Sequence, residues 1–414
     1  MASDAASPPA RFTIWSQVRA LTASPMAPYY FIAAAVTVLV GIGSLMVLSS
    51  SSVLAISRGV TPYYYIIRQL VFLAAGIFFM VILIRMKPSF LRSFGWVFWV
   101  LAVLLLIAVQ VPGLGVLVNG NRNWIRIVDG VQFQPSEFAK LALVVWCGAI
   151  FHNKRGRLHE PLQLAVPLMP LGGLILALVL AGRDLGTGLI IGLIIVAIMW
   201  FIGTPLRVLI PLGIAALSLV ALLVFGSGNR MSRIAIFLDP QSNTDLSSQP
   251  MAALYALASG GWWGLGLGAS KQKWGGLKDG AHTDYIFAVI GEELGLFGIL
   301  LIVAMFALLG WAGLEIAMRS DKMFNRVVAA GITGWFLVQA TINIFVVMHL
   351  LPVLGVPLPF VSYGGSALIA SLMAVGVLLS LARDTPDARA YLASRKAPAR
   401  PRMTSVMAAS REDS

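Results

Sequence analysis

Ten apolar segments, each about long enough for one membrane crossing, dominate this sequence. A helix needs about 20 apolar residues to span the hydrocarbon core of a bilayer. The segments lie near 29–50, 65–84, 95–112, 135–151, 162–181, 186–203, 207–226, 293–316, 327–350 and 361–382. Charged residues make up 11% of the chain, against roughly 25% in soluble domains. We therefore expect an all-α polytopic membrane protein with ten transmembrane helices.

The distribution of Lys and Arg predicts the orientation. If the N-terminus is cytoplasmic, most of the 30 Lys and Arg fall in the inner loops and the tail, which is the usual bias of membrane proteins. Both termini are then cytoplasmic, and the net charge of +13 marks the inner face rather than a nucleic-acid site. The single cysteine, Cys147, cannot form an intrachain disulfide.

The domain organisation follows from these segments. Residues 1–28 form a polar cytoplasmic segment and residues 383–414 a basic cytoplasmic tail, both expected to be disordered. Residues 29–382 form the membrane domain. Within it, residues 227–292 form a large, partly helical extracytoplasmic loop between the seventh and eighth helices.

This outer loop is the only long interruption of the apolar sequence. Loops beyond about 12–15 residues are usually functional or disordered, and the apolar and aromatic residues of this one favour order. Ser247 or Ser248 can cap a short helix with Pro250 in its first turn, ended by Gly260-Gly261. The apolar stretch 285–316 is too long for one upright helix. We expect its first nine residues to form an outer, interfacial piece.

Ionisable residues in or beside the apolar segments are candidates for function, because charges at membrane depth are costly. They are Arg68, Glu137, Lys140, Asp184, Asp284, Glu292, Glu293 and Glu315. With the orientation above, all of these except Glu315 belong to the outer half of the protein. This placement predicts a polar cavity that opens toward the outer leaflet.

Each candidate also has a purely structural explanation. Glu137 and Lys140 lie three residues apart and could neutralise each other on one helix face. Asp184 could cap the sixth helix, with Thr187 nearby. The loop lysines could be solvated, and Trp262-Trp263 could be an interfacial anchor rather than a sugar-stacking platform.

Asp284 is the strongest candidate for catalysis. It follows His282 and Thr283 on a loop that also carries basic residues. A carboxylate there can accept a proton from a substrate hydroxyl, while Lys or Arg nearby can hold a diphosphate. Its alternative role is to cap the helix that starts at Tyr285. The sequence has no phosphate-binding Gly-Lys-Ser/Thr loop and no His/Cys zinc cluster.

Taken together, several stretches resemble the SEDS family (shape, elongation, division and sporulation), which includes FtsW and RodA. The resemblance covers about residues 30–382 and favours the FtsW branch, because of Lys271–Gly275 and the basic tail. The matching stretches are Asn121–Arg126, Gln134–Lys140, Asp184–Thr187, Arg233–Pro240, Gly264–Gly268, Ala281–Ala288, Gly291–Gly295 and Pro359–Ser366.

The resemblance implies an inverting peptidoglycan glycosyltransferase that polymerises lipid II at the outer face of the bacterial cytoplasmic membrane, for septal wall synthesis in cell division. It implies a class B penicillin-binding protein and other division proteins as partners, and places the essential acidic residue at Asp284. A divalent cation (Mg²⁺ or Mn²⁺) could assist, although no metal-ligand set is visible. Lys271, Lys273, Arg122 and Arg126 are candidates for the diphosphate. The candidate substrate-binding residues are Arg68, Arg122, Trp124, Arg126, Gln134, Glu137, Lys140, Asp184, Gln249, Lys271, Lys273, His282, Glu292 and Ser362.

The sequence departs from the family pattern at several positions. Gly182-Arg183 replace the usual Glu-Pro before Asp184, and Ala252 replaces a second Gln after Gln249. The roles of Asp184 and of the 249–259 helix therefore stay open. Two other functions also stay open: a lipid II flippase, which would need a site at the membrane midplane, and a division scaffold without chemistry.

Overall fold

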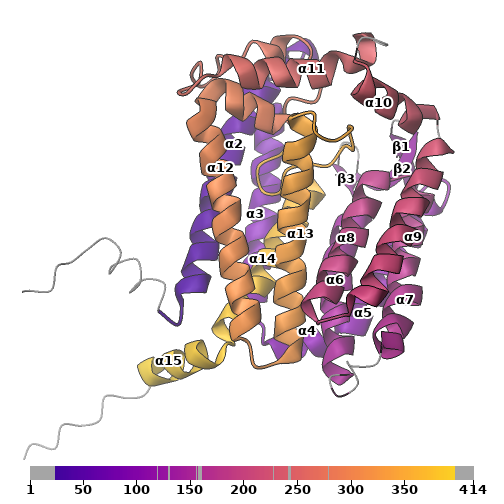
Figure 1. The fold of residues 1–414 in the computed structure, drawn as a ribbon. Helices are drawn as coiled ribbons and strands as arrows, with labels where there is room; N and C mark the ends of the chain where they lie inside the picture. The colour runs from indigo at the N-terminus through magenta and orange to yellow at the C-terminus, as the bar shows by residue number, and fades with distance from the viewer. Residues whose placement is uncertain are drawn as a thin grey trace, which may run out of the picture.

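The computed structural model describes residues 24–118, 120–128, 131–154, 156, 161–226, 228–240, 244–277 and 279–396. Within these residues the chain is predominantly helical, and its long helices run side by side in one bundle (Figure 1). These are α2 (Ala27–Ser57), α3 (Tyr64–Arg85), α5 (Gly95–Gln110), α6 (Pro135–Asn153), α7 (Pro161–Ala181), α8 (Leu185–Phe201), α9 (Leu206–Phe225), α12 (Ile286–Arg319), α13 (Met323–Val347) and α14 (Gly365–Arg383).

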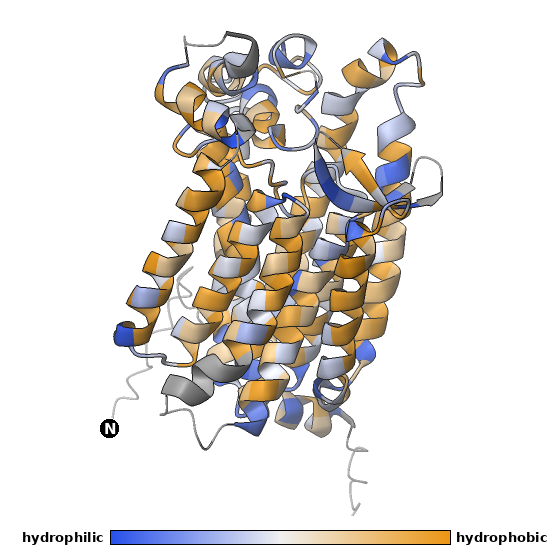
Figure 2. Ribbon diagram, turned by 90° about the vertical axis from the view of Figure 1, so that its right-hand side faces the viewer, coloured by the Kyte–Doolittle hydropathy of each residue, from blue (hydrophilic) through white to orange (hydrophobic). Residues whose placement is uncertain are grey.

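Each expected apolar segment overlaps one of these long helices. In the described residues, six helices are long and apolar enough to cross a membrane, namely α2, α3, α9, α12, α13 and α14. Gly95–Gln110, Leu168–Ala181 and Leu185–Phe201 are apolar but shorter. Apolar residues run along the bundle, and hydrophilic ones gather toward its two ends (Figure 2). The chain is a multi-pass membrane protein, and the count of ten crossings stays a prediction.

Helix α13 lies in the core of the bundle, packed against α6, α8 and α12. Small residues permit this close approach, as is common between membrane helices. A Cβ on Gly331 would lie 2.7 Å from Cγ1 of Val144 on α6. The C-terminal half of α13 carries two buried polar side chains, Gln339 and Asn343, both of which contribute to the site described below.

A small antiparallel sheet between α5 and α6 is the main departure from the all-α expectation. Its strands β1 (Gly115–Val118), β2 (Asn121–Val128) and β3 (Val131–Phe133) pair in the order β1-β2-β3. The sequence did carry a signal for it. Asn-Gly and Asp-Gly at 119–120 and 129–130 separate the strands, and such dipeptides between β-branched residues are typical of hairpins.

The outer loop covers one end of the bundle with α10 (Gly228–Leu238), α11 (Thr244–Ser259) and the short helix η2 (Gln272–Trp274) (Figure 1). Helix α11 ends before Gly260-Gly261 as predicted. It begins earlier than predicted, so Pro250 lies inside the helix rather than in its first turn. Proline lacks an N–H, and α11 therefore forgoes one backbone hydrogen bond there.

Helix α12 is broken at Gly295, whose φ of 65° and ψ of −161° are not helical. This break confirms that the long apolar stretch divides into two pieces. The first piece is not interfacial in its surroundings, however, because Ile286–Glu293 is buried in the protein on all sides. Glycine tolerates this positive φ because it has no Cβ.

The opposite end of the bundle holds the start of α2, the end of α14 and two short helices, α4 (Pro88–Ser93) and α15 (Pro386–Lys396) (Figure 1). The prediction of a disordered tail is wrong for α15. Its Arg389 forms a 2.6 Å ion pair with Asp321 in the α12–α13 loop. Residues 1–23 and 397–414, which carry the other disorder predictions, lie outside the described residues.

Candidate active site

Asp284 ends the outer loop, immediately before α12. The preceding residues form consecutive turns, in which the backbone N–H of Ala281 donates to Leu277 O at 2.7 Å and that of Tyr285 to Gly280 O at 3.1 Å. Ala281 and Tyr285 are both buried and anchor the turns. We name Gly280–Tyr285 the acidic loop.

The segment between α13 and α14 donates hydrogen bonds to the backbone of the acidic loop. The hydroxyl of Ser362 donates to Thr283 O at 2.6 Å, and the backbone N–H of Tyr363 donates to His282 O at 2.8 Å. Ser362 in turn accepts from the backbone N–H of Leu358 at 2.9 Å. Ser362, predicted as a substrate-binding residue, is thus used to position the backbone of the acidic loop.

Asn343 on α13 ties the same two segments together. Its Nδ2 donates to the backbone carbonyls of Asp284 and Val356, each at 2.8 Å. The sequence analysis did not select Asn343. Its one signal was a polar side chain within an apolar segment, where such groups are costly.

The Asp284 carboxylate itself has no hydrogen-bond donor among the described residues. Burial raises the pKa of Asp284 from 3.8 to about 6, and the positive charge of Arg233 acts in the opposite direction. Its Oδ2 faces Gly355, where a Cβ would lie 3.7 Å away. The carboxylate is therefore oriented by its backbone and free to accept a proton, as a general base must be.

Arg233 on α10 is the cation beside Asp284. Its Nη1 donates to Val353 O at 3.1 Å, two residues from Gly355. It has no carboxylate partner within the ion pairs that the described residues form. The sequence analysis quoted Arg233 as part of a family stretch but did not place it in the site, because nothing in the sequence shows that α10 folds back over Asp284.

Glu137 and Lys140 form a buried ion pair of 2.9 Å on α6. Lys140 Nζ also donates to Gln339 Oε1 at 2.9 Å and lies 4.7 Å from the centroid of the Trp335 ring. Gln339 Nε2 then donates to Pro357 O at 2.9 Å. The structure therefore shows Glu137 and Lys140 neutralising each other, as the structural explanation above has it. Through Gln339, the pair also supports the segment between α13 and α14.

Asp184 caps α8, because its Oδ1 accepts from the backbone N–H of Thr187 at 3.0 Å. This confirms the helix-cap alternative. The other oxygen of the same carboxylate, Asp184 Oδ2, accepts from Gln134 Nε2 at 3.2 Å. Gln134, predicted to bind substrate, thus orients the carboxylate that caps α8.

Strand β2, which carries the predicted basic and aromatic residues, lies toward the end of the bundle that α10 and α11 cover (Figure 1). Arg122 Nη1 donates to Gln110 O at the end of α5 at 3.1 Å, which turns its charge toward the bundle. Arg122, Gln110 and Asp184 also line a cavity of about 10 Å³, the size of one water site. Trp124 is half-buried, whereas Arg126 is exposed.

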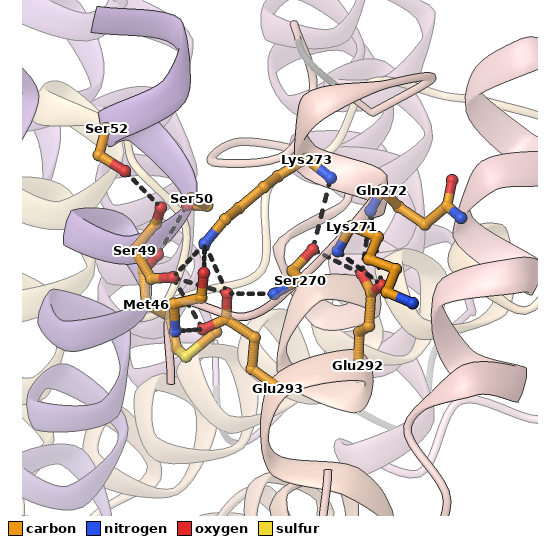
Figure 3. A network of polar contacts seen from close by, with 11 residues as sticks. Met46, Ser49, Ser50, Ser52, Ser270, Lys271, Gln272, Lys273, Glu292 and Glu293 are labelled. Atoms are coloured by element: carbon orange, nitrogen blue, oxygen red, sulfur yellow. Dashed lines mark hydrogen bonds and ion pairs between the residues drawn. The ribbon is translucent and has the colours of Figure 1, made fainter. Parts of the chain in front are cut away.

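The two glutamates that follow the acidic loop fold the glycine-rich part of the outer loop. Glu293 accepts from Ser49 on α2 at 2.7 Å, from Gly268 N at 2.9 Å and from Lys273 Nζ at 2.9 Å. Glu292 accepts from Ser270 Oγ and from Lys271 N (2.9 Å). Figure 3 shows these groups converging between α2 and the end of the loop.

This network corrects two predictions. The ammonium of Lys273 is buried and shared by Glu293, Ser49 and Gly268 O, so it does not face a diphosphate. Glu292 is completely buried against loop backbone, so it does not face substrate. Lys271 differs, because only its backbone joins the network and its side chain is exposed.

His282 lies in an aromatic cluster beside the acidic loop. Its ring centroid is 5.2 Å from that of Tyr65 and 5.3 Å from that of Tyr363. Burial lowers the pKa of His282 to about 4, assisted by the charge of Arg58, so the imidazole is neutral near pH 7.

Arg68, another predicted substrate-binding residue, donates to the Tyr64 hydroxyl at 2.9 Å.

Gln249 on α11 lies close to the first residue of the acidic loop, since a Cβ on Gly280 would lie 3.7 Å from Gln249 Oε1.

In the residues that the structure describes, no group of three or more His, Cys, Asp or Glu could hold a metal ion.

Comparison with known proteins adds independent information. The family model described as "Cell cycle protein", which covers FtsW, RodA and SpoVE, matches residues 30–386. The chain is 36% identical over 388 residues to a "Probable peptidoglycan glycosyltransferase FtsW" of Mycobacterium tuberculosis, covering 94% of this chain and 72% of the relative. It is 34% identical to the "Stage V sporulation protein E" of Bacillus subtilis, covering 88% and 99% of the two chains.

Solved structures show the same fold. A chain from a peptidoglycan synthase complex that coordinates polymerization and crosslinking matches with a TM-score of 0.70 and 26% identity, over 86% of this chain and 97% of the other. The rod shape determining protein RodA of Thermus thermophilus matches with a TM-score of 0.63 and 25% identity, over 86% and 96%.

Proposed function

The chain belongs to the family of cell cycle proteins that contains FtsW, RodA and SpoVE, and we propose that it is a peptidoglycan glycosyltransferase that polymerises lipid II. The relatives named FtsW carry that glycosyltransferase activity in their names. We assign the reaction to the outer face of the cytoplasmic membrane, and to that face we assign the end of the bundle that α10, α11 and the acidic loop cover. The FtsW resemblance favours a role in septal wall synthesis.

One observation carries this proposal: the Asp284 carboxylate is held by its backbone, lacks a donor among the described residues, and has a pKa raised to about 6. Such a group is a base matched to a hydroxyl substrate near neutral pH. Asp284 takes the proton of the 4-hydroxyl of the acceptor GlcNAc. That oxygen forms a bond to C1 of the donor MurNAc with inversion, while the bond from C1 to the diphosphate oxygen breaks.

Arg233 supplies the second requirement of this reaction. The leaving undecaprenyl diphosphate gains negative charge as its bond to C1 breaks, and a fixed cation stabilises that charge most when it is already in place. Arg233 is anchored by one bond to Val353 O and keeps further N–H donors for phosphate oxygens, which guanidinium groups bind in a forked geometry. Lys271 and Arg126 are more peripheral candidates for the same diphosphate.

The partner is a class B penicillin-binding protein, which would cross-link the strands made here. The similar chain from a peptidoglycan synthase complex supports this pairing.

With the acidic loop assigned to the outer face, both termini are assigned to the cytoplasm. The start of α2 and the end of α14 lie at the end of the bundle away from the acidic loop, which supports this assignment (Figure 1).

The test is glycan-strand formation from purified lipid II by the purified full-length chain in detergent, with and without a class B penicillin-binding protein. We expect strands from the wild type and at least a tenfold lower rate from Arg233→Gln. Arg230→Gln is the matched control on the same helix, because Arg230 bonds to the carbonyls of Leu223 and Arg183 within the described part of the chain. The rate of this variant should stay within about threefold of the wild-type rate. Failure of the wild type under both conditions would reject the proposal.

A further inference from the structure

A second cationic surface lies at the outer ends of α2 and α3, away from α10. Arg58 Nη1 donates to the Tyr65 hydroxyl at 2.7 Å. Arg68 Nη1 donates to the Tyr64 hydroxyl at 2.9 Å, and its Cζ lies 5.3 Å from the centroid of the Tyr64 ring. The two tyrosine rings are themselves in edge contact, with centroids 5.2 Å apart. Two guanidinium groups are thus held on neighbouring tyrosines.

Neither guanidinium is paired with a carboxylate of the residues that the structure describes. None of the ion pairs formed by the described residues involves Arg58 or Arg68, and Arg58 is exposed. Each bond to a tyrosine hydroxyl uses one N–H and leaves the others free. A pair of Arg side chains in fixed positions with free donors is suited to a phosphate or diphosphate.

Aromatic rings in tilted and edge contact join this surface to the acidic loop. Tyr65, which orients Arg58, has its ring centroid 5.2 Å from that of His282 and 5.5 Å from that of Tyr363. His282 precedes Asp284 by two residues, and its carbonyl accepts from the backbone N–H of Tyr363 at 2.8 Å. The rings of Tyr65 and His282 therefore link Arg58 to the acidic loop.

The chemistry of the proposed reaction requires two diphosphates at unequal distances from Asp284. In the donor, C1 of MurNAc carries the diphosphate directly, so this group must lie beside the reacting atoms. In the acceptor, the reacting 4-hydroxyl is on GlcNAc and the diphosphate is on the far side of MurNAc, two sugar rings away. The charge of Arg233 acts directly on Asp284, as the donor position requires. Arg58 contacts the acidic loop through the rings of Tyr65 and His282, as the more distant acceptor position requires.

We propose that Arg58 and Arg68 bind the diphosphate of the acceptor lipid, while Arg233 faces the diphosphate of the donor. This assignment rests on the proposed function. It makes Arg58 and Arg68 binding residues that hold the acceptor and do not act on the bond that breaks. Their loss should weaken substrate binding and spare the rate at saturation.

The binding test uses farnesyl diphosphate and the full-length protein in detergent, with stoichiometry read by native mass spectrometry. We expect two molecules per wild-type chain, one for Arg58→Gln/Arg68→Gln, and one for Arg233→Gln. Arg395→Gln is the matched control: Arg395 also lies over a tyrosine ring, 5.7 Å from that of Tyr391, but at the opposite end, and two molecules should still bind. A stoichiometry in Arg58→Gln/Arg68→Gln equal to that of the wild type would overturn the proposal.

Competitors identify the anion that the surface recognises. Inorganic diphosphate should displace farnesyl diphosphate from the arginine pair, and phosphatidylglycerol at the same concentration should not. Equal displacement by phosphatidylglycerol would mean a general surface for anionic phospholipids and would overturn the assignment. Unchanged thermal unfolding of the variants is the check on folding. Tyr65→Phe, which removes only the hydroxyl that orients Arg58, should weaken binding less than loss of the guanidinium does.

Kinetics separate the two arginine sites. With lipid II as substrate, Arg58→Gln/Arg68→Gln should raise KM at least tenfold and leave kcat within twofold, whereas Arg233→Gln should lower kcat. A fall in kcat with unchanged KM in Arg58→Gln/Arg68→Gln would contradict the acceptor assignment. If the wild type makes no strands, the proposed function fails, yet the farnesyl diphosphate stoichiometry still tests the arginine pair on its own.

Discussion

The side-chain amide of Asn343 donates to the backbone carbonyl of Asp284 at 2.8 Å. The same nitrogen donates to Val356 O at 2.8 Å, so one buried amide on α13 joins the acidic loop to the segment before α14. Asn343 contacts the backbone of Asp284 and not its carboxylate. It therefore fixes the position of Asp284 and leaves the lone pairs of the carboxylate available for a proton.

Asn343→Ala should therefore reduce catalysis as well as stability. The buried carbonyl of Val356 and the partly buried carbonyl of Asp284 lose their donor, and a buried group left unsatisfied costs roughly 1–3 kcal/mol. The acidic loop also loses its link to α13. We expect a lower Tm and at least a tenfold fall in kcat for strand formation. Asn325→Ala is the control, because Asn325 bonds Asp384 at the opposite end. An Asn343→Ala enzyme with wild-type kcat would contradict this role.

The pH dependence of the reaction should report Asp284. A base with a pKa of about 6 is protonated below that value, so kcat should fall about tenfold per pH unit on the acid side and level off above it. Because the charge of Arg233 lowers the pKa of Asp284, Arg233→Gln should move the acid limb to higher pH. Initial rates of strand formation from pH 4.5 to 8 measure both effects, and an acid limb that Arg233→Gln does not move would argue against this coupling.

The same carboxylate should destabilise the fold at neutral pH. Its pKa in the folded protein, about 6, lies above the ordinary value of 3.8. Ionisation therefore favours the unfolded chain as pH rises through this window. Asp284→Asn should be more stable than the wild type at pH 8 by up to ~3 kcal/mol, with the difference vanishing below pH 4. Thermal unfolding in detergent across this range is the measurement, and a less stable variant at pH 8 would contradict it.

His282 should act in the opposite sense. Its pKa in the fold, about 4, lies below the ordinary 6.5, so the unfolded chain gains a proton first and stability falls as pH drops from 6.5 to 4. His282→Phe keeps an aromatic ring between Tyr65 and Tyr363 but cannot titrate. Compared in an Asp284→Asn background, it should show a flatter dependence of Tm on pH. Equal slopes with and without His282 would mean that the imidazole already carries a charge in the fold.

The Glu293–Lys273 pair should matter far more than a surface pair. Removing one partner leaves a buried charge without compensation, which costs about 3–5 kcal/mol, whereas replacing both relieves that cost. We expect Lys273→Met to lower Tm strongly and expose the loop around Gly268 to proteases, and Lys273→Met/Glu293→Gln to recover part of the loss. Arg319→Ala, which breaks the partly exposed pair with Glu315, should cost under about 1 kcal/mol. A double variant as unstable as Lys273→Met would argue against the ion pair.

The sequence predicted the helices well because the apolar segments have the length that a bilayer demands. It predicted the break near Gly295 for the same reason, since the stretch exceeds one crossing. The sheet was not predicted, because its strands of three to eight residues lie between two much stronger apolar segments. The Asn-Gly and Asp-Gly dipeptides between the strands were the available signal for it.

The site was predicted less completely. Asp284 could be selected because it ends a polar loop at the edge of an apolar segment. Arg233 and Asn343 reach it from α10 and α13, which are 51 and 59 residues away along the chain, and no local pattern encodes such contacts. Lys273 and Glu292 were misjudged because a charged loop residue looks the same in sequence whether it faces substrate or a buried partner.

The most direct test of Asp284 as the catalytic base is the rate of glycan-strand formation by purified Asp284→Asn beside the wild type, with the class B penicillin-binding protein present. Bound farnesyl diphosphate is counted on the same samples to show that the site is intact. The account predicts strands from the wild type, none above background from Asp284→Asn, and two molecules of farnesyl diphosphate on each. Strands from Asp284→Asn at the wild-type rate would show that another group takes the proton.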